Sequence, residues 1–547
     1  MVCRRGRFPS AASVGLAAVA TVAFVLPLTY LAWTAATALV VPALPGRYGW
    51  GLLGRTLLYS SSAGLLAVAM GAVVARVIGR QQQGDACGRG AWELSRRLLL
   101  ACVPATLVIP SLVYAYGGQQ ALRLVGWMPD PGSAADVLRC VVTVAAWLWG
   151  VPAAVVALAW NRLDPWTLQQ AVLDGAYRRV TLRLLAGPML AAWCLTTALA
   201  TQEFAVFETT GIPVAATEMR VVFETGAFLG ADAPAATQSQ RAAAAIVTGL
   251  PSLLATLGLF GAALLWAWRL VVPPSADDAA GGTVPPAGHA TQGPLAAHAF
   301  AYLVVAATLA VPVAALVLSL RDPAPPWQWL ATFRPQVGGT LLMGALGCLA
   351  GAAIVLLGSV ARPWTALGLG LATFLVGGLF VGIALVRLYN RPWTFWVYDT
   401  PLVTVLGYVA RYGWVALLTS AAVAHGPSAR RLREMAAVDG AGPWATLTRV
   451  VLPTMWPAAV AASLGVGVLS LGEVPTTMLV APPSPPLLTP LLLSWVHMQR
   501  YDPMIQACLL LVGVCLAVAV PLTLGLLTVT RSTSRRSRGR RPPAGSW

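Results

Sequence analysis

The segment QQAVLDGA, residues 169–176, has a counterpart in the segment EMAAVDGA, residues 434–441. The interval from Asp174 to Asp439 is 265 positions, and Pro188 and Pro453 stand at the same interval. Each segment is short and polar and lies between long apolar stretches. Two matching segments in one register predict a duplicated unit in a single chain.

The composition places this duplicated unit in a lipid bilayer. The chain has 547 residues, 58% of them hydrophobic and only 10% charged, and its mean hydropathy is +0.73. That is more apolar surface than a water-soluble domain can bury. We therefore predict an all-α polytopic membrane protein, with membrane lipid as its surroundings.

Twelve apolar stretches are long enough to cross a hydrocarbon core of about 30 Å. They lie near residues 11–41, 52–78, 97–117, 137–160, 188–213, 241–271, 298–320, 338–361, 364–388, 401–425, 453–480 and 504–530. We predict two homologous six-helix halves, residues 1–271 and 298–530. Residues 272–297 are rich in Pro and Gly and predict a flexible cytoplasmic linker, and residues 531–547 form a basic tail.

The charged residues orient the chain and exclude some functions. The net charge is +17 and every basic residue is arginine; the arginines cluster at both termini and around both repeated segments, which predicts that these lie in the cytoplasm. We expect no nucleic-acid partner. A phosphate-binding loop requires lysine, so any ATP would be bound by another chain. The eight cysteines and four histidines form no metal-site spacing, and we expect no metal and no cofactor bound by this chain.

The residue types in the repeated segments predict a rigid cytoplasmic helix-turn-helix. Ala436 and Ala437 are small and would let another surface approach a short helix closely. Gly440 permits a turn that a residue with a Cβ resists. Asp439 can accept backbone hydrogen bonds at the start of the next helix, and Pro453 suits the first turn of the following span.

These residues carry a resemblance to a known family. EMAAVDG, residues 434–440, through VVLP, residues 450–453, resembles the EAA signature of binding-protein-dependent ABC importer permeases. The resemblance implies the type I ABC importer transmembrane fold, with residues 434–445 docking into an ATP-hydrolysing subunit. The first copy departs from the pattern at Gln169 and at Gly187. The coupling residues it implies are Gln169, Ala171, Asp174, Gly175, Ala176, Pro188, Glu434, Ala436, Ala437, Asp439, Gly440, Ala441 and Pro453.

Other motifs extend the resemblance over most of each half. LGEVPTT, residues 471–477, looks like a segment of fused iron(III)-type permeases, and QEFAV, residues 202–206, occupies a comparable place. The resemblance implies a non-enzymatic permease in a prokaryotic cytoplasmic (inner) membrane, with ferric iron as the best substrate hypothesis. Related branches of the family carry thiamine, polyamines, phosphonates and oxyanions such as sulfate or molybdate. The partners it implies are two ATPase subunits, which bind ATP and Mg²⁺, and an external or periplasmic solute-binding protein.

Three glutamates, Glu203, Glu208 and Glu473, lie late in their predicted spans. An ionisable group at membrane depth is a functional candidate, so these residues line the substrate pathway, reach the external interface or brace helix ends. Trp147, Trp149, Trp393 and Trp396 are interpreted as interfacial aromatics.

Two other classes of protein remain as alternatives. A secondary transporter with two six-helix repeats would show the same duplication, but it needs no paired cytoplasmic loops. A membrane enzyme should present clustered acids, histidines or metal ligands at an interface, and the sequence shows none.

Overall fold

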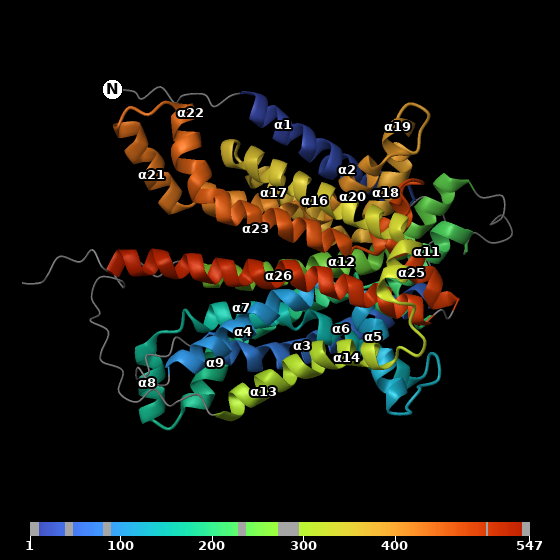
Figure 1. Ribbon diagram of the computed structural model, residues 1–547, viewed down its shortest axis with the longest axis horizontal. Helices are drawn as coiled ribbons and strands as arrows, with labels where there is room; N and C mark the ends of the chain where they lie inside the picture. Colours follow the sequence, from blue (N-terminus) through green and yellow to red (C-terminus); the bar gives the residue numbers. More distant parts are fainter. Residues whose placement is uncertain are drawn as a thin grey trace, which may run out of the picture.

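The computed structural model describes residues 10–38, 47–79, 89–227, 237–271, 295–498 and 501–538, and every regular element in these ranges is a helix (Figure 1). Nine helices in the described ranges are long and apolar enough to cross a membrane, and the number reaches twelve if each of three bent helix pairs is one span. The prediction of an all-α polytopic membrane protein is confirmed at this level.

The elements before residue 272 form what we call the first set. In chain order they are α1 (Ser10–Ala20), the π-helix η1 (Thr21–Val25), α2 (Leu26–Ala38), α3 (Arg47–Ile78), α4 (Arg89–Val108), α5 (Ser111–Leu124), α6 (Ala134–Leu148), α7 (Gly150–Trp160), α8 (Pro165–Leu173), α9 (Tyr177–Ala200), α10 (Ala205–Glu208), α11 (Ala215–Thr225) and α12 (Gln238–Val271).

The elements from residue 295 onward form the second set. They are α13 (Leu295–Val305), η3 (Ala306–Ala310), α14 (Val311–Leu318), α15 (Pro326–Thr332), α16 (Arg334–Val360), α17 (Trp364–Val376), α18 (Gly378–Tyr389), α19 (Phe395–Tyr398), α20 (Pro401–Thr419), η4 (Ser420–Ala424), α21 (Pro427–Val438), α22 (Pro443–Thr446), η5 (Leu447–Val451), α23 (Leu452–Leu471), α24 (Pro475–Val480), α25 (Leu488–His497) and α26 (Tyr501–Arg538).

Two predicted spans are sharply bent rather than straight. The stretch predicted near 97–117 is divided between α4 and α5, which meet at 100°, and the stretch near 364–388 is divided between α17 and α18, which meet at 105°. Pro110 stands at the first break and cannot continue the hydrogen-bond ladder. Gly377 stands at the second, with a φ of +98° that residues with a Cβ rarely adopt.

The sequence predicted that the two repeated prolines open their spans, but in both spans the helical run begins before the proline. Pro188 lies inside α9, which begins at Tyr177. Pro453 lies inside a continuous helical run from Trp444 to Leu471. The π-helix η5 ends at Val451, and Pro453 follows in the first turn of α23. A wider turn of this kind accommodates the missing N–H and the bulk of the proline ring.

The first helical run of each set packs on the other set. The run α1–η1–α2 contacts α16, α17 and α18, while α13–η3–α14 contacts α3, α4 and α5. Tyr389 of α18 donates a hydrogen bond to the carbonyl of Val22 at 3.1 Å. Trp149, between α6 and α7, donates its Nε1 proton to Thr308 Oγ1 at 2.9 Å. Because Trp149 is completely buried, its interpretation as an interfacial aromatic is wrong.

A matched hydrogen bond occurs in each set. Thr56 of α3 accepts the N–H of Ala215, at the start of α11, at 3.0 Å. Thr340 of α16 accepts the N–H of Leu488, at the start of α25, at 2.8 Å. In both cases a buried threonine fixes the start of a short helix, which satisfies one of the N–H groups that a helix start leaves without an intrahelical partner.

The short helices gather at opposite ends of the molecule. α8 and α21 lie at one end, here called the loop end, and α11, α19 and α25 lie at the other (Figure 1). α26 ends at the loop end as well, and it continues as a helix to Arg538, past the predicted limit of the span at 530. The predicted linker lies almost entirely outside the described residues, because 272–294 are not among them.

Candidate functional site

The two repeated segments form the first part of the candidate site. Each is the end of a short helix at the loop end, α8 in the first set and α21 in the second. α8 begins after Asp164, whose carboxylate accepts the N–H groups of Trp166 and Thr167 at 3.2 and 3.1 Å. Such a cap satisfies two of the N–H groups at the helix start.

Both helices end in the same turn. Gly175 has a φ of +65° and Gly440 a φ of +74°. The N–H of Ala176 bonds to the carbonyl of Ala171 at 2.9 Å, and the N–H of Ala441 bonds to that of Ala436 at the same distance. A left-handed glycine with this six-residue hydrogen bond is a Schellman motif. The turn predicted for Gly440 is therefore present, and Gly175 makes it too.

The sequence predicted that Asp439 accepts backbone hydrogen bonds at the start of the next helix, and the described residues show no such bond for it or for Asp174. Asp174 and Asp439 are the C-cap residues of α8 and α21. The N-cap of α9 is Ala176, with no side-chain capping bond. Within the described ranges, neither aspartate side chain makes a hydrogen bond, so both carboxylates remain available at the loop end.

The small residues of the segments divide between two faces. Ala171 and Ala436 are buried against the chain itself, so Ala436 does not offer the close approach that the sequence had suggested, whereas Ala437 is exposed. Leu173 and Val438, directly before the aspartates, are 85% and 86% exposed. Sequence reasoning missed these two residues, although an apolar residue before Asp-Gly in both copies was a visible signal.

Side chains join α21 to the end of α16. His425 Nε2 lies 2.9 Å from the carbonyl of Gly358, and Arg433 donates to the carbonyl of Ser359 at 3.3 Å. Glu434 pairs with Arg430 at 2.9 Å, but both side chains are exposed, and such a pair contributes little to stability. The carboxylate of Glu434 therefore lies on the surface, while α21 is fixed from its other side.

The second part of the candidate site is a buried polar cluster around Glu473. Its Oε1 accepts the N–H of Thr476 at 3.2 Å and the Thr476 hydroxyl at 2.6 Å. Its Oε2 accepts the hydroxyl of Tyr412. Arg411 of α20 completes the cluster, with Nε 3.5 Å from Oε1. Glu473 thus braces the start of α24 and is neutralised by an arginine.

The other two predicted glutamates have different surroundings. Glu203 is buried and accepts the N–H of Val206 at 3.1 Å, at the start of α10. Glu208 pairs with Arg220 at 2.6 Å, and Arg220 also binds Glu224. Glu203 and Glu473 therefore brace helix starts in the same way, and Glu208 belongs to a separate ion-pair group that ties α10 to α11.

Two residues that sequence reasoning missed connect the sets near this cluster. Gln202, after α9, donates its amide proton to the carbonyl of Leu375 in α17 at 3.0 Å. Arg411 donates to Phe374 O at 2.6 Å and to Gln202 Oε1 at 3.3 Å. An arginine inside the predicted span 401–425 was the signal that could have identified this cluster.

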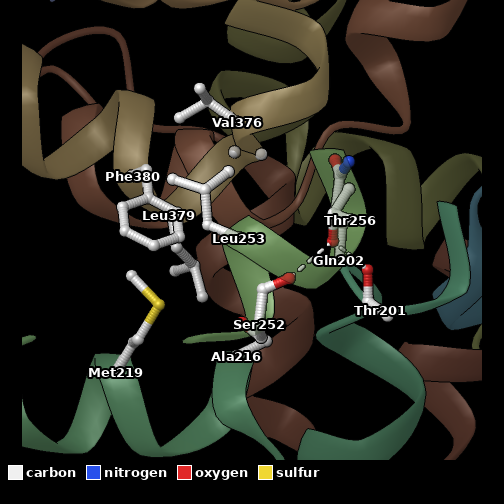
Figure 2. Close-up of a pocket in the computed structure, with 12 residues that line it drawn as sticks. Thr201, Gln202, Ala216, Met219, Ser252, Leu253, Thr256, Val376, Leu379 and Phe380 are labelled. Atoms are coloured by element: carbon white, nitrogen blue, oxygen red, sulfur yellow. Dashed lines mark hydrogen bonds between the residues drawn. The ribbon is translucent and has the colours of Figure 1, made fainter. Parts of the chain in front are cut away.

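A small pocket lies beside Gln202, between α9, α11, α12 and the α17–α18 break. Its cavity volume is about 20 Å³, room for about one water molecule. Figure 2 shows that Thr201, Gln202, Ser252 and Thr256 occupy one side and that apolar side chains, among them Phe380, occupy the other. The hydroxyls of Thr201 and Thr256 are 2.6 Å apart.

The described residues include no group of three or more His, Cys, Asp or Glu side chains that could hold a metal ion. The polar atoms of the buried cluster around Glu473 mostly pair with one another and with helix ends. These contacts are suited to joining neighbouring helices and to fixing the positions of the helix breaks. No family model matches the chain, and comparisons with curated proteins and with solved structures gave no match either.

Proposed function

We propose that the chain is the membrane-spanning permease of an ABC importer, with both transmembrane halves fused in one polypeptide. The observation that carries the proposal is the pair of loops at one end of the molecule. Each has the same Schellman turn, the same Asp-Gly, and an apolar residue, Leu173 or Val438, that no described segment covers. Exposed apolar residues on a rigid short helix are suited to docking into a groove of another protein.

A duplicated architecture supports the proposal. Three features recur in the same order in both sets. They are the first helical run packed on the other set, the backbone N–H accepted by Thr56 or Thr340, and the helix start braced by Glu203 or Glu473. Two related halves with one docking loop each suit a pair of ATPase subunits. Closure of that pair would draw α8 and α21 together and rock the halves, which is alternating access.

The partners follow from this arrangement. ATP and Mg²⁺ belong on the two ATPase subunits, and the chain itself catalyses no covalent step. An external solute-binding protein would dock at the end opposite α8 and α21, where α11 and α25 lie. The arginine distribution favours cytoplasmic termini, and the resemblance favours the cytoplasmic (inner) membrane of a prokaryote.

The solute is proposed from the resemblance of residues 471–477 alone, and ferric iron is the first to test. Iron(III) is a hard cation that prefers oxygen ligands. Glu473 is occupied by Arg411 and by the start of α24, so selection of the solute is assigned to the external binding protein.

A secondary transporter is the second candidate function, and one observation favours it. Such proteins place binding sites at broken helices near the bilayer midplane and often use buried charges there. The α17–α18 break lies beside the buried Arg411 and Glu473 pair. This hypothesis gives no role to α8 and α21, and it therefore ranks second.

The decisive experiment is purification of the tagged protein in mild detergent, with Mg²⁺-dependent ATP hydrolysis measured in the eluate. We expect activity with the wild type, loss of most of it in Val438→Asp and Gly440→Pro, and a smaller loss in Glu434→Ala. Val125→Asp is the matched control, because Val125 is 74% exposed and lies outside the loops. An eluate without ATPase activity in every detergent and in lipid nanodiscs would favour the secondary transporter.

A further inference from the structure

Gln202 lies where the two sets meet at a helix break. It is two residues past the end of α9, and its side chain lies against Gly377, between α17 and α18. A Cβ placed on Gly377 would be 3.5 Å from the Gln202 amide oxygen. Glycine at 377 therefore allows the positive φ, and the Gln202 side chain packs directly beside it.

Gln202 donates a hydrogen bond to one of the last carbonyl groups of α17. The last carbonyl groups of a helix have no intrahelical partner, and in α17 two of them are occupied by side chains from elsewhere. Arg411 of α20 takes Phe374 O at 2.6 Å, and Gln202 takes Leu375 O at 3.0 Å. An arginine at a helix C-terminus is also favourable for the helix dipole. The bent geometry is thus held by one residue from each set.

The amide of Gln202 is used at both ends. Its nitrogen donates to Leu375 O, and its oxygen accepts from Arg411 at 3.3 Å. Movement of the end of α9 away from α17 would break both bonds together. It would leave a carbonyl and part of a guanidinium without partners in a buried place, which is unfavourable.

The equivalent contact at the other break has no such side chain. Gly472 precedes Glu473 as Gln202 precedes Glu203, and Gly472 lies against Pro110, between α4 and α5, where an added Cβ would be 3.3 Å from Pro110 Cγ. The two crossings therefore occupy comparable places, but only the Gln202 crossing is hydrogen-bonded through a side chain.

We propose that Gln202 is a positioning residue that holds the α17–α18 break against the end of α9 and keeps the pocket between them closed. This inference rests on the proposed transport function, because separation of α9 from the break would open the transport path. Removing the Gln202 amide should raise the population of molecules in which the end of α9 has separated from α17. The loss of hydrogen bonds of this kind corresponds to roughly a five- to tenfold change in that population.

The test measures how readily the pocket is reached in the chain alone. Leu253, which lines the pocket beside Gln202, is replaced by Cys, and the labelling rate by a membrane-impermeant thiol reagent is measured in proteoliposomes without ATP. Each variant is compared with the same chain lacking Leu253→Cys, which removes the contribution of the native cysteines. Gln202→Leu keeps the bulk of the side chain and removes its hydrogen bonds.

Gln506→Leu is the matched control, because Gln506 also donates its amide proton to a carbonyl, Ala324 O at 2.6 Å, in an exposed contact. We expect labelling at residue 253 to accelerate roughly five- to tenfold in Gln202→Leu and to stay unchanged in Gln506→Leu. If Gln202→Leu does not purify as a monodisperse protein, Gln202→Asn, one methylene shorter, replaces it.

Equal labelling rates in the wild type and the Gln202 variant would overturn the inference, whether or not an ATPase co-purifies. Faster labelling in both glutamine variants would overturn it as well, since the effect would then not be specific to the break. Faster labelling in the Gln202 variant alone supports it. That result would stand even if the ATPase assay failed, so the two proposals fail separately.

Discussion

The guanidinium of Arg411 lies beside the carboxylate of Glu473, with Nε 3.5 Å from Oε1 and with side chains only 10% and 3% exposed. Replacing Arg411 by Met would leave the carboxylate buried without its cation. Breaking a buried pair from one side costs about 3–5 kcal/mol. We expect Arg411→Met to lower the free energy of unfolding by an amount in that range, measured by denaturant unfolding in detergent micelles.

The double variant Arg411→Met, Glu473→Gln separates charge from packing. A neutral amide can still accept the N–H of Thr476, and no uncompensated charge remains. We expect it to recover more than half of the stability lost in the single variant. A double variant as unstable as Arg411→Met alone would show that the ionic contact is not what stabilises this cluster.

The hydroxyls of Thr56 and Thr340 should contribute to stability in the same way in both sets. Each is buried and accepts the N–H at the start of a short helix. Valine has the same shape but cannot accept, so Thr56→Val and Thr340→Val should each cost about 1–3 kcal/mol, the usual penalty for an orphaned buried donor. The corresponding serine variants, measured by the same thermal unfolding, should lose less. Equal losses in the serine and valine variants would point to packing instead.

The sequence predicted the membrane class and the position of both loops, because apolar length and a repeated polar segment are local features. In the part of the chain that the structure describes, the twelve apolar stretches correspond to nine candidate spans and three bent helix pairs. Gly440 has the backbone conformation that its place in the repeat required. The bends at Pro110 and Gly377 were not predicted, since a proline or glycine within an apolar run is also compatible with a straight span.

Long-range pairing was beyond the sequence argument. Gln202 and Arg411 are 209 positions apart, and nothing in either segment indicates that both reach the end of α17. Ala436 was misjudged for a related reason. A small residue suits an exposed contact and a buried one equally well, and only the packing of α21 shows that Ala436 faces its own chain.

The cap of α8 should depend on pH. Slight burial raises the pKa of Asp164, but hydrogen bonds from Thr167 and Trp166 outweigh that effect, and the pKa lies below its ordinary value. A carboxylate with a lowered pKa in the folded state stabilises fully above the unfolded value of about 3.9. That stabilisation is lost as the pH falls through the folded value.

Asp164→Ala should therefore weaken α8 by about 1 kcal/mol at neutral pH, seen as faster hydrogen exchange of the Trp166 and Thr167 amides. Asp164→Asn keeps an acceptor, so its exchange at neutral pH should stay near that of the wild type and should not change as the pH falls toward 3, after correction for intrinsic rates. A wild-type protection that is constant over the same interval would contradict the role of the carboxylate.

The exchanged helical runs give the last prediction. Trp149 is fully buried, and its Nε1 proton is donated to Thr308 across the two sets. Thr308→Val would leave that N–H without its acceptor inside the protein, at a cost of about 1–3 kcal/mol, whereas Thr308→Ser keeps the acceptor. At the opposite crossing, Tyr389→Phe removes the donor to the Val22 carbonyl. Val22 lies in a helix, where its carbonyl can also accept a backbone N–H, so we expect a smaller loss of stability there. Thermal unfolding of the three variants in one detergent checks the order, and a Tyr389→Phe loss larger than that of Thr308→Val would reverse our assignment of which crossing contributes more.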